Sequence, residues 1–269
     1  MSRPLRALYV DLDNTLLGRG ASLLHDGEGR VTNLGFRAIE LCHRADVEVV
    51  LMSGRRRAQV MEDARLLGCP AYIFEAGAAV IYPNDEDWLT EPYLPGERSV
   101  FEQVGATGAP EFLLERYGPE RLEYHDPWHR DRDVSHLFRG DIDALEATAL
   151  LEEHGYEHLR LVDNGAIHPV ERGWRAFHLV PKGVSKGRAV ERHMRARGYP
   201  AEGCIAVGDS REDLTVAGVV GTFWLVANAL DRDPLLAAAL PRNARVTEAG
   251  NGPGVYEAVM TELAERRTV

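Results

Sequence analysis

The sequence is poor in cysteine and has no long apolar runs. Its three cysteines, Cys42, Cys69 and Cys204, lie far apart and form no C-x-x-C pair. This spacing argues against a disulfide framework and predicts core thiols in a reducing cytoplasm. No apolar run approaches the length that spans a membrane, and residues 5–10 are too short for the apolar core of a signal peptide. We therefore expect a cytoplasmic protein without a membrane partner.

Positively charged residues are outnumbered by negatively charged ones. The chain has 31 Lys and Arg against 42 Asp and Glu, a formal net charge of −11. Nucleic acids reward an excess of Lys and Arg, so no nucleic-acid partner is expected. An anionic ligand would need a local positive centre, supplied by a metal ion or a placed lysine. With 269 residues, 45% hydrophobic and 27% charged, the chain otherwise suits a globular protein of one large or two medium domains.

The segment ALYVDLDNTL, residues 7–16, runs from an apolar strand directly into two carboxylates. In an extended backbone, residues two apart project to the same side, so Asp11 and Asp13 would share one small volume. Two anions there are tolerable if a divalent cation joins them or if one holds a proton. The same residues also suit a simple turn, which Asp13 and Asn14 would begin.

Apolar strands alternate with helical patterns through much of the chain. We expect strands at residues 7–10, 47–52, 71–74, 204–207 and 222–227, and helices at 32–45, 56–67, 185–197, from 213, and at 254–265. A glycine-rich loop, residues 18–29, follows the first strand. This alternation predicts an α/β fold with a doubly wound, Rossmann-like parallel sheet.

The alternation stops near Pro83 and resumes after Pro181. We expect a catalytic α/β core from residues 1–83 and 182–269, with an inserted α+β domain at 84–181. Within the insertion, residues 112–117 and 142–154 favour helices, and 159–162 and 176–180 favour strands. An antiparallel sheet with helices on one face is the expected arrangement.

Several of the expected strands end in chemically reactive residues. Asp11 follows the first strand, Ser53 the second, and Asp209 the strand at 204–207. Ligands of open parallel sheets bind at the carboxyl ends of strands, so these ends could converge on one pocket. Carboxylates at such an edge suit Mg²⁺ better than zinc. Lys186 lies in the first turn of a predicted helix, where a cation is unfavourable unless an anion lies beside it.

In chain order the sequence holds DLDNTLL from Asp11, SGR from Ser53, SKGRAV around Lys186 and GDSREDL around Asp209. Together these stretches resemble the ordered motifs of the haloacid dehalogenase superfamily, most of whose members are Mg²⁺-dependent phosphatases. The resemblance covers residues 7–75 and 181–259. The insertion is similar to the type-two cap of the branch that contains Cof-like sugar phosphatases, sucrose-phosphatase and mannosyl-3-phosphoglycerate phosphatase.

The resemblance implies a Mg²⁺-dependent phosphomonoesterase that hydrolyses a small phosphorylated metabolite, such as a sugar or sugar-acid phosphate. Asp11 resembles the nucleophile that forms an aspartyl-phosphate, and Asp13 the general acid and base. A phosphosugar mutase with the same aspartate pair is an alternative. A non-catalytic receiver, in which phosphorylated Asp11 shifts a partner-binding surface, is another.

The resemblance also implies how the phosphoryl group and the metal are held. Ser53, the Gly54 amide and Lys186 would bind the phosphoryl oxygens. The metal would be held by the carboxylate of the first acid, the backbone carbonyl of the second and the carboxylate of Asp209. Asp213 would steady that shell or Lys186.

The sequence differs from the family pattern at three positions. Asn14, Glu75 and Glu212 stand where the family more often has Gly, Asn and Asn. An added carboxylate near the pocket, from Glu75 or Glu212, would repel phosphate or reshape substrate contacts. These departures do not change the expected reaction class. They do mean that the substrate of this protein need not be the substrate of its relatives.

Other polar and aromatic residues of the insertion have simpler explanations. The pairs His125/His129 and His154/His158 have the spacing of helical zinc ligands, but Pro127 and Gly155 interrupt them. Trp128 and Trp174 are interpreted as core residues rather than a sugar-stacking surface. Scattered arginines are interpreted as a solvated face, although they could form a basic surface; they are Arg130, Arg132, Arg139, Arg172 and Arg175.

Overall fold

The computed structural model describes residues 4–167 and 173–267, which are built on two β-sheets. The larger sheet has eight strands in the order β12-β11-β10-β1-β2-β3-β4-β5. The strands from β12 to β3 are parallel, and β4 and β5 are antiparallel to their neighbours. Their bounds are β1 Ala7–Asp11, β2 Glu48–Met52, β3 Ala71–Phe74, β4 Ala79–Tyr82, β5 Asp85–Trp88, β10 Cys204–Gly208, β11 Thr222–Leu225 and β12 Ala244–Val246.

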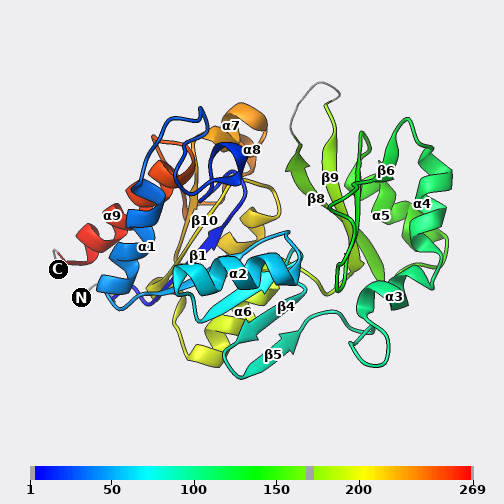
Figure 1. Cartoon of the computed structure of the whole chain (residues 1–269), viewed down its shortest axis with the longest axis horizontal. Helices are drawn as coiled ribbons and strands as arrows, with labels where there is room; N and C mark the ends of the chain where they lie inside the picture. Colours follow the sequence, from blue (N-terminus) through cyan, green and yellow to red (C-terminus); the bar gives the residue numbers. More distant parts are fainter. Residues whose placement is uncertain (1–3, 168–172, 268–269) are drawn as a thin grey trace.

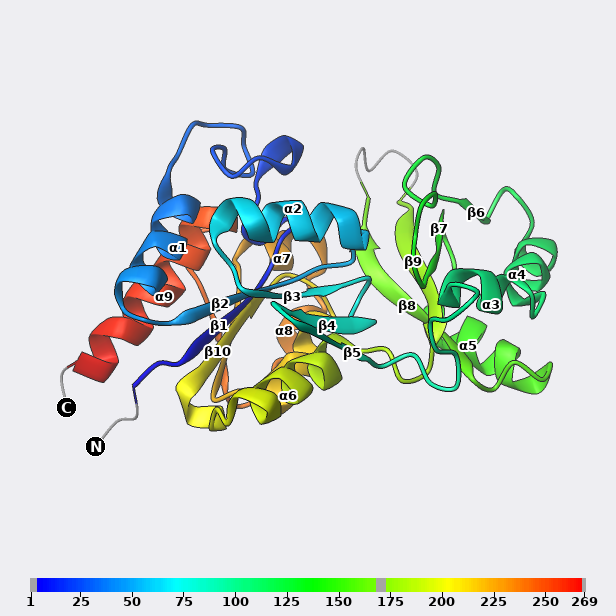
Figure 2. The same cartoon turned by 60° about the horizontal axis from the view of Figure 1, so that its bottom comes forward.

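Helices cover both faces of the larger sheet (Figures 1 and 2). Strand side chains alternate in direction, so Leu8 and Val10 of β1 pack toward one face and Tyr9 toward the other. The first face is covered by α1 (Leu34–Arg44), α2 (Arg57–Leu67) and α9 (Asn251–Arg267). The second is covered by α6 (Lys186–Arg197), the 3₁₀ helix η4 (Asp213–Gly218), α7 (Asn228–Arg232) and α8 (Leu236–Ala239). The predicted doubly wound parallel sheet is confirmed.

The smaller sheet is antiparallel, with strand order β6-β7-β9-β8. Its helices lie on the side away from the larger sheet (Figures 1 and 2). This arrangement confirms the expected antiparallel sheet with helices on one face. The bounds are β6 Leu122–Tyr124, β7 His136–Gly140, β8 Leu159–Ala166, β9 Arg175–Pro181, α3 Val100–Gly105, α4 Ala109–Tyr117 and α5 Ala144–Glu153.

We call the part with the larger sheet the core and the part with the smaller sheet the cap. The chain enters the cap after β5 and returns from β9 to α6. The domain division at residues 84 and 181 stays a prediction, but β5 pairs with β4 in the larger sheet, so that sheet extends past residue 84. The hairpin of β4 and β5 was not expected, because β5 is the exposed, acidic segment DEDW.

Some ends of elements differ from the sequence-based expectation. The last helix begins at Asn251 rather than at residue 254, because Gly252 and Pro253 lie in its first turn, where proline costs no hydrogen bond. The strand expected at 222–227 ends at Leu225. All three cysteines are free and buried, as expected. No helix in the described ranges is both long and apolar enough to span a membrane.

Candidate active site

The predicted acids and Lys186 meet at the carboxyl edge of the larger sheet. Because β1 and β10 are parallel neighbours, Asp11 at the end of β1 and Asp209 just after β10 lie at the same edge. Lys186 reaches them from the first residue of α6. Its Nζ donates to Asp11 Oδ1 at 2.7 Å and to Asp213 Oδ1 at 2.6 Å. One carboxylate oxygen from each of Asp11, Asp209 and Asp213 lies within 4.8 Å of the other two.

Lys186 is a buried cation matched by buried anions. Its side chain is 1% exposed. Burial by itself lowers the pKa of Lys186, but Asp11 and Asp213 outweigh burial and raise the pKa above its usual value. Glu212 places its carboxylate at the start of α6, where it accepts the backbone N–H of Lys186 at 3.3 Å. The unfavourable position of a cation at a helix N-terminus is thus offset by neighbouring carboxylates.

Burial shifts the pKa of two acids at this edge upward. Burial raises the pKa of Asp11 well above its usual value; Lys186 opposes this shift, and Asp213 and Asp209 add to it. Burial likewise raises the pKa of Asp209 to about 6, against the opposing effect of Arg232. A divalent cation between these carboxylates would favour their charged forms. The donor set consists of hard oxygens, which fit Mg²⁺.

Asp213 is held by hydrogen bonds on both carboxylate oxygens. Its Oδ1 accepts from Lys186, and its Oδ2 accepts from the backbone N–H groups of Asp209 at 3.1 Å and Ser210 at 3.0 Å. A Cβ on Gly208 would lie 2.4 Å from the Asp213 Cβ, so only glycine permits this approach. Asp213 is therefore placed to orient the lysine and the Asp209 turn.

Asp13 lies apart from this cluster and is held by Arg55. Arg55 donates from Nη2 to Asp13 Oδ1 at 2.6 Å and from Nε to Asp13 Oδ2 at 2.7 Å. A third bond runs from Arg55 Nη1 to Asp63 Oδ2 at 3.0 Å. The Asp13 side chain remains 47% exposed and lines the cleft beside Asp11. Such a bidentate pair fixes the carboxylate in one orientation. The sequence reasoning missed Arg55, although it follows Ser53 and Gly54 directly.

The Ser53–Gly54 turn lies between β2 and α2, with cap residues directly opposite. The Ser53 side chain is buried, and its Oγ accepts the Arg55 N–H at 3.1 Å. A Cβ built on Gly54 would lie 2.9 Å from Asn164 Nδ2 and 3.0 Å from His178 Nε2. Glycine at position 54 therefore allows the cap to approach the turn closely.

Core and cap together line a cleft of about 490 Å³. From the core come the predicted site residues Asp11, Asp13, Ser53, Gly54, Lys186 and Asp209. From the cap come polar and aromatic side chains, among them His125, Trp128, Arg132, Asn164 and His178. The interpretation of Trp128 as a core residue is wrong, since it is 50% exposed and lines the cleft, whereas Trp174 is buried as expected.

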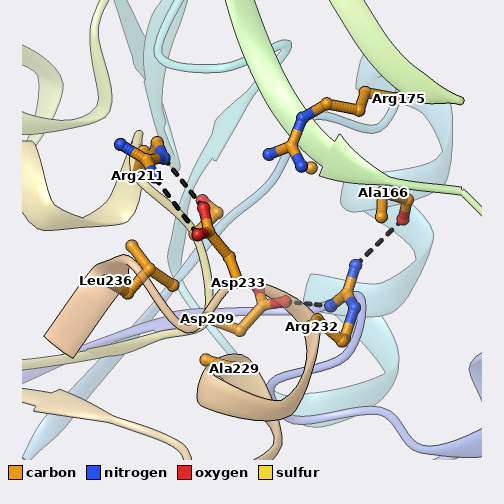
Figure 3. Close-up of a pocket in the computed structure, with 10 residues that line it drawn as sticks. Ala166, Arg175, Asp209, Arg211, Ala229, Arg232, Asp233 and Leu236 are labelled. Carbon is orange, nitrogen blue, oxygen red and sulfur yellow. Dashed lines mark hydrogen bonds and ion pairs between the residues drawn. The ribbon is translucent and has the colours of Figure 1, made fainter. Parts of the chain in front are cut away.

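Two further residues hold Asp209. Thr15 donates its hydroxyl to Asp209 Oδ1 at 3.2 Å. Arg232, from α7, pairs with Asp209 Oδ2 and donates from Nη2 to the carbonyl of Ala166 in β8 at 2.9 Å. Figure 3 shows the Arg232 guanidinium between these two partners. Arg232 thus joins the core to the cap beside a proposed metal ligand, and no local pattern in its short helix predicted this role.

The departures from the family pattern do not place free carboxylates in the cleft. Glu75 is fully buried and accepts hydrogen bonds from the cap, and Glu212 pairs with Arg160 of β8 at 3.3 Å. Neither carboxylate therefore lines the cleft where it would repel phosphate. The alternative, that these residues reshape substrate contacts, stays a prediction. Asn14 has φ 64°, a left-handed conformation that Asn tolerates better than most residues, which explains Asn in place of Gly.

Within the described ranges, the acidic cluster is the one group of three or more His, Cys, Asp or Glu side chains that could hold a metal ion, and it includes neither histidine pair. The cap arginines Arg130, Arg139 and Arg175 pair with Asp126, Glu123 and Asp163, as expected of a solvated face. Arg132 is instead buried against Glu75. Arg172 lies outside the described residues.

Comparisons with known proteins agree with this geometry. The family model of haloacid dehalogenase-like hydrolases matches residues 128–256. The chain is 28% identical over 255 residues to a phosphoglycolate phosphatase of Methanosarcina mazei, covering 94% of this chain and 95% of the relative. It is 29% identical over 255 residues to a phosphoglycolate phosphatase of Methanoculleus marisnigri, covering 95% of each.

The fold is also similar to that of a solved phosphatase. The sucrose-phosphatase of Synechocystis sp. PCC6803, solved with sucrose and phosphate, superposes with a TM-score of 0.66 at 17% identity, over 97% of this chain and 98% of that one. At this identity the likeness concerns the fold alone. The motifs, the family model and the curated relatives therefore support a hydrolase of the haloacid dehalogenase superfamily. The arrangement of core and inserted cap is similar to that of the solved sucrose-phosphatase.

Proposed function

We propose that this protein is a Mg²⁺-dependent phosphomonoesterase that acts through an aspartyl-phosphate on a small phosphorylated metabolite. The observation that supports this most is the position of Lys186. Its ammonium group contacts Asp11 and Asp213 beside Asp209, at the edge of a cleft that the cap closes. A protein with a net charge of −11 needs such a local positive centre to hold a phosphate ester.

In the proposed reaction, Asp11 attacks phosphorus and the bond between phosphorus and the leaving oxygen breaks. Asp13 gives its proton to that oxygen. Asp13 then takes a proton from water as the water oxygen attacks the aspartyl-phosphate, which releases phosphate and restores Asp11. Arg55 donates to both oxygens of Asp13 and holds this side chain at the cleft. One of these two hydrogen bonds would open when Asp13 carries the proton.

The remaining residues of the site would bind and orient the phosphoryl group. Lys186 would neutralise its charge while holding one oxygen of Asp11, and Ser53 with the Gly54 amide would hydrogen-bond its other oxygens. The metal would be held by the carboxylates of Asp11 and Asp209 and the backbone carbonyl of Asp13. A bound Mg²⁺ would stabilise negative charge on the phosphoryl oxygens.

The proposed substrates are sugar or sugar-acid phosphates. The relatives in Methanosarcina and Methanoculleus are named for phosphoglycolate, a phosphorylated acid. The similar Synechocystis structure holds sucrose and phosphate. The cleft of about 490 Å³ has room for a ligand of this size. Three free, buried cysteines suit the cytoplasm, where we place the protein.

The proposal is tested by replacing the nucleophile. Asp11→Asn should abolish Mg²⁺-dependent phosphate release from an aryl phosphate and leave the circular dichroism spectrum unchanged, because the amide cannot attack phosphorus. Asp87→Asn, in β5 outside the cleft, is the matched control and should retain full activity. Wild-type activity in Asp11→Asn would remove the nucleophile and with it the proposed mechanism.

A further inference from the structure

We propose that Glu75 is a positioning residue, whose carboxylate clamps cap residues 132–135 onto the Ser53–Gly54 turn and so fixes the groups around the phosphoryl site. The proposal rests on the proposed function and assigns a role to a residue outside the catalytic set. Glu75 lies in the turn after β3, at the boundary between core and cap contacts.

The carboxylate of Glu75 accepts four hydrogen bonds from the cap. Its Oε1 accepts the Asp133 N–H at 2.9 Å. Its Oε2 accepts the Val134 N–H at 3.2 Å, the Ser135 N–H at 2.6 Å and the Ser135 hydroxyl at 2.7 Å. The side chain is fully buried. Consecutive N–H groups that converge on one carboxylate form an anion-binding nest, and here the anion comes from the core.

The charge of Glu75 is matched by Arg132, which continues the contact to the phosphate-binding turn. Arg132 Nη1 lies 3.7 Å from Glu75 Oε2, and the arginine side chain is 4% exposed. The same Nη1 donates to the Gly54 carbonyl at 3.2 Å and to Ser135 Oγ at 3.1 Å. One guanidinium group therefore connects the clamp directly to Gly54.

The hydrogen bonds of Ser135 also determine the orientation of His178. The Ser135 hydroxyl donates its one hydrogen bond to Glu75 Oε2. Ser135 Oγ must then accept from His178 Nδ1, which lies 3.0 Å away. Burial lowers the pKa of His178 well below its usual value, so the ring is neutral and Nε2 carries a lone pair. That nitrogen faces Gly54.

Losing the clamp should therefore loosen both sides of the phosphoryl site. The cap loop would lose its four hydrogen bonds to the core, and Arg132 would keep a buried charge without its partner. Small displacements of groups around a reacting centre cost one or two orders of magnitude in rate. We expect the loss to appear mainly in kcat, because the clamp orients the site and does not touch the substrate.

The experiment compares Glu75→Gln with Glu262→Gln. Glu262 is a second buried carboxylate, in α9 on the far side of the core, where it accepts from Trp224 at 3.0 Å and Arg266 at 2.8 Å. Glu75→Gln turns one acceptor oxygen into a donor facing backbone N–H groups. Its kcat per folded enzyme on an aryl phosphate should fall about 10- to 100-fold with a smaller change in KM. Glu262→Gln should destabilise the core but keep wild-type kcat.

Hydrogen exchange provides a readout that does not depend on activity. In Glu75→Gln the amides of residues 133–135 should exchange at least about tenfold faster than in the wild type, and in Glu262→Gln they should not. Ser135→Ala, which removes one donor and keeps the backbone, should shift exchange and kcat in the same direction by less. It serves as the test if Glu75→Gln does not fold.

Unchanged exchange at residues 133–135 would overturn the clamp, and faster exchange with unchanged kcat would overturn its role in positioning. Absence of phosphatase activity in the wild type would instead refute the proposed function, and the exchange result would still decide whether the clamp exists.

Discussion

Lys186 has a role that no other cationic side chain of this protein could fill. The sequence contains two lysines, Lys182 and Lys186, and every other formal positive charge belongs to arginine. A compact ammonium group fits between two carboxylates in a fully buried space, where a planar guanidinium group would demand more room and more partners. The use of lysine at position 186 therefore follows from the narrow gap between Asp11 and Asp213.

Lys186→Met should destabilise the protein by about 3–5 kcal/mol, because it leaves buried carboxylates without their cation. It should also reduce hydrolysis of an aryl phosphate about 10²- to 10³-fold through loss of phosphoryl charge stabilisation. Urea unfolding and initial rates measure the two effects. Lys182→Met, which breaks an exposed pair with Glu152, is the control and should cost under about 1 kcal/mol with no loss of rate. Equal effects of the two variants would contradict the assigned role.

Among the elements, the start of α6 depends on the turn that follows β3. Gly77 has φ 101°, and a Cβ at this position would lie 2.3 Å from the carbonyl carbon of Ser185 and 2.6 Å from the Lys186 nitrogen. The turn after β3 therefore packs directly against the residues that begin α6. The position of the Lys186 ammonium group depends on this contact, because it sets where the helix begins.

Gly77→Ala should lower the free energy of unfolding by about 2 kcal/mol or more, since both the conformation and the space exclude a methyl group. It should also reduce activity per folded enzyme by displacing Lys186. Gly96→Ala is the matched control, because a Cβ there meets no atom within 4 Å. Chemical denaturation and aryl phosphate hydrolysis provide the comparison. A stable, fully active Gly77→Ala would show that the backbone around Ser185 can shift to accommodate a methyl group without loss of function.

At the scale of the molecule, the core and the cap meet across one cleft, and the two parts carry different titrating groups. The core supplies acids, and the cap supplies histidines whose pKa is lowered by burial, among them His125 and His129. The pKa of His125 is lowered to about 4, mainly by burial and to a smaller extent by the charges of Arg139 and Arg132. The pKa of His129 is likewise lowered to about 4, mainly by burial and to a smaller extent by His136. Acidification should therefore change the stability of the cap through the protonation of these two histidines.

The sign of the effect follows from proton linkage. In the unfolded chain these histidines bind protons below about pH 6.5, and in the folded cap only near pH 4. The unfolded state binds more protons in this window, so the cap loses stability as the pH falls from about 6.5 to 4. Hydrogen exchange of cap amides at several pH values measures this loss. In His125→Gln/His129→Gln the dependence should be shallower, and an identical slope would exclude these residues as its source.

Much of the fold was predictable because its signals are local. Apolar runs ending in Asp11 and Asp209 predicted buried parallel strands, and the edge where they converge follows from sheet topology. The hairpin of β4 and β5 was missed because β5 is polar and pairs at the sheet edge. Trp128 was misassigned because composition does not distinguish an aromatic residue in a core from one that lines a cleft.

The sequence by itself determined the parallel sheet and the inserted cap, and it predicted the acids and the lysine of the candidate site, because strand periodicity and motif spacing depend on neighbouring residues. Only the tertiary structure decided which charges meet: Asp13 with Arg55, Asp209 with Arg232, and Glu75 with the cap loop. Ion pairs and hydrogen bonds depend on distances of a few ångströms between atoms far apart in the chain. The packing of cap against core sets those distances.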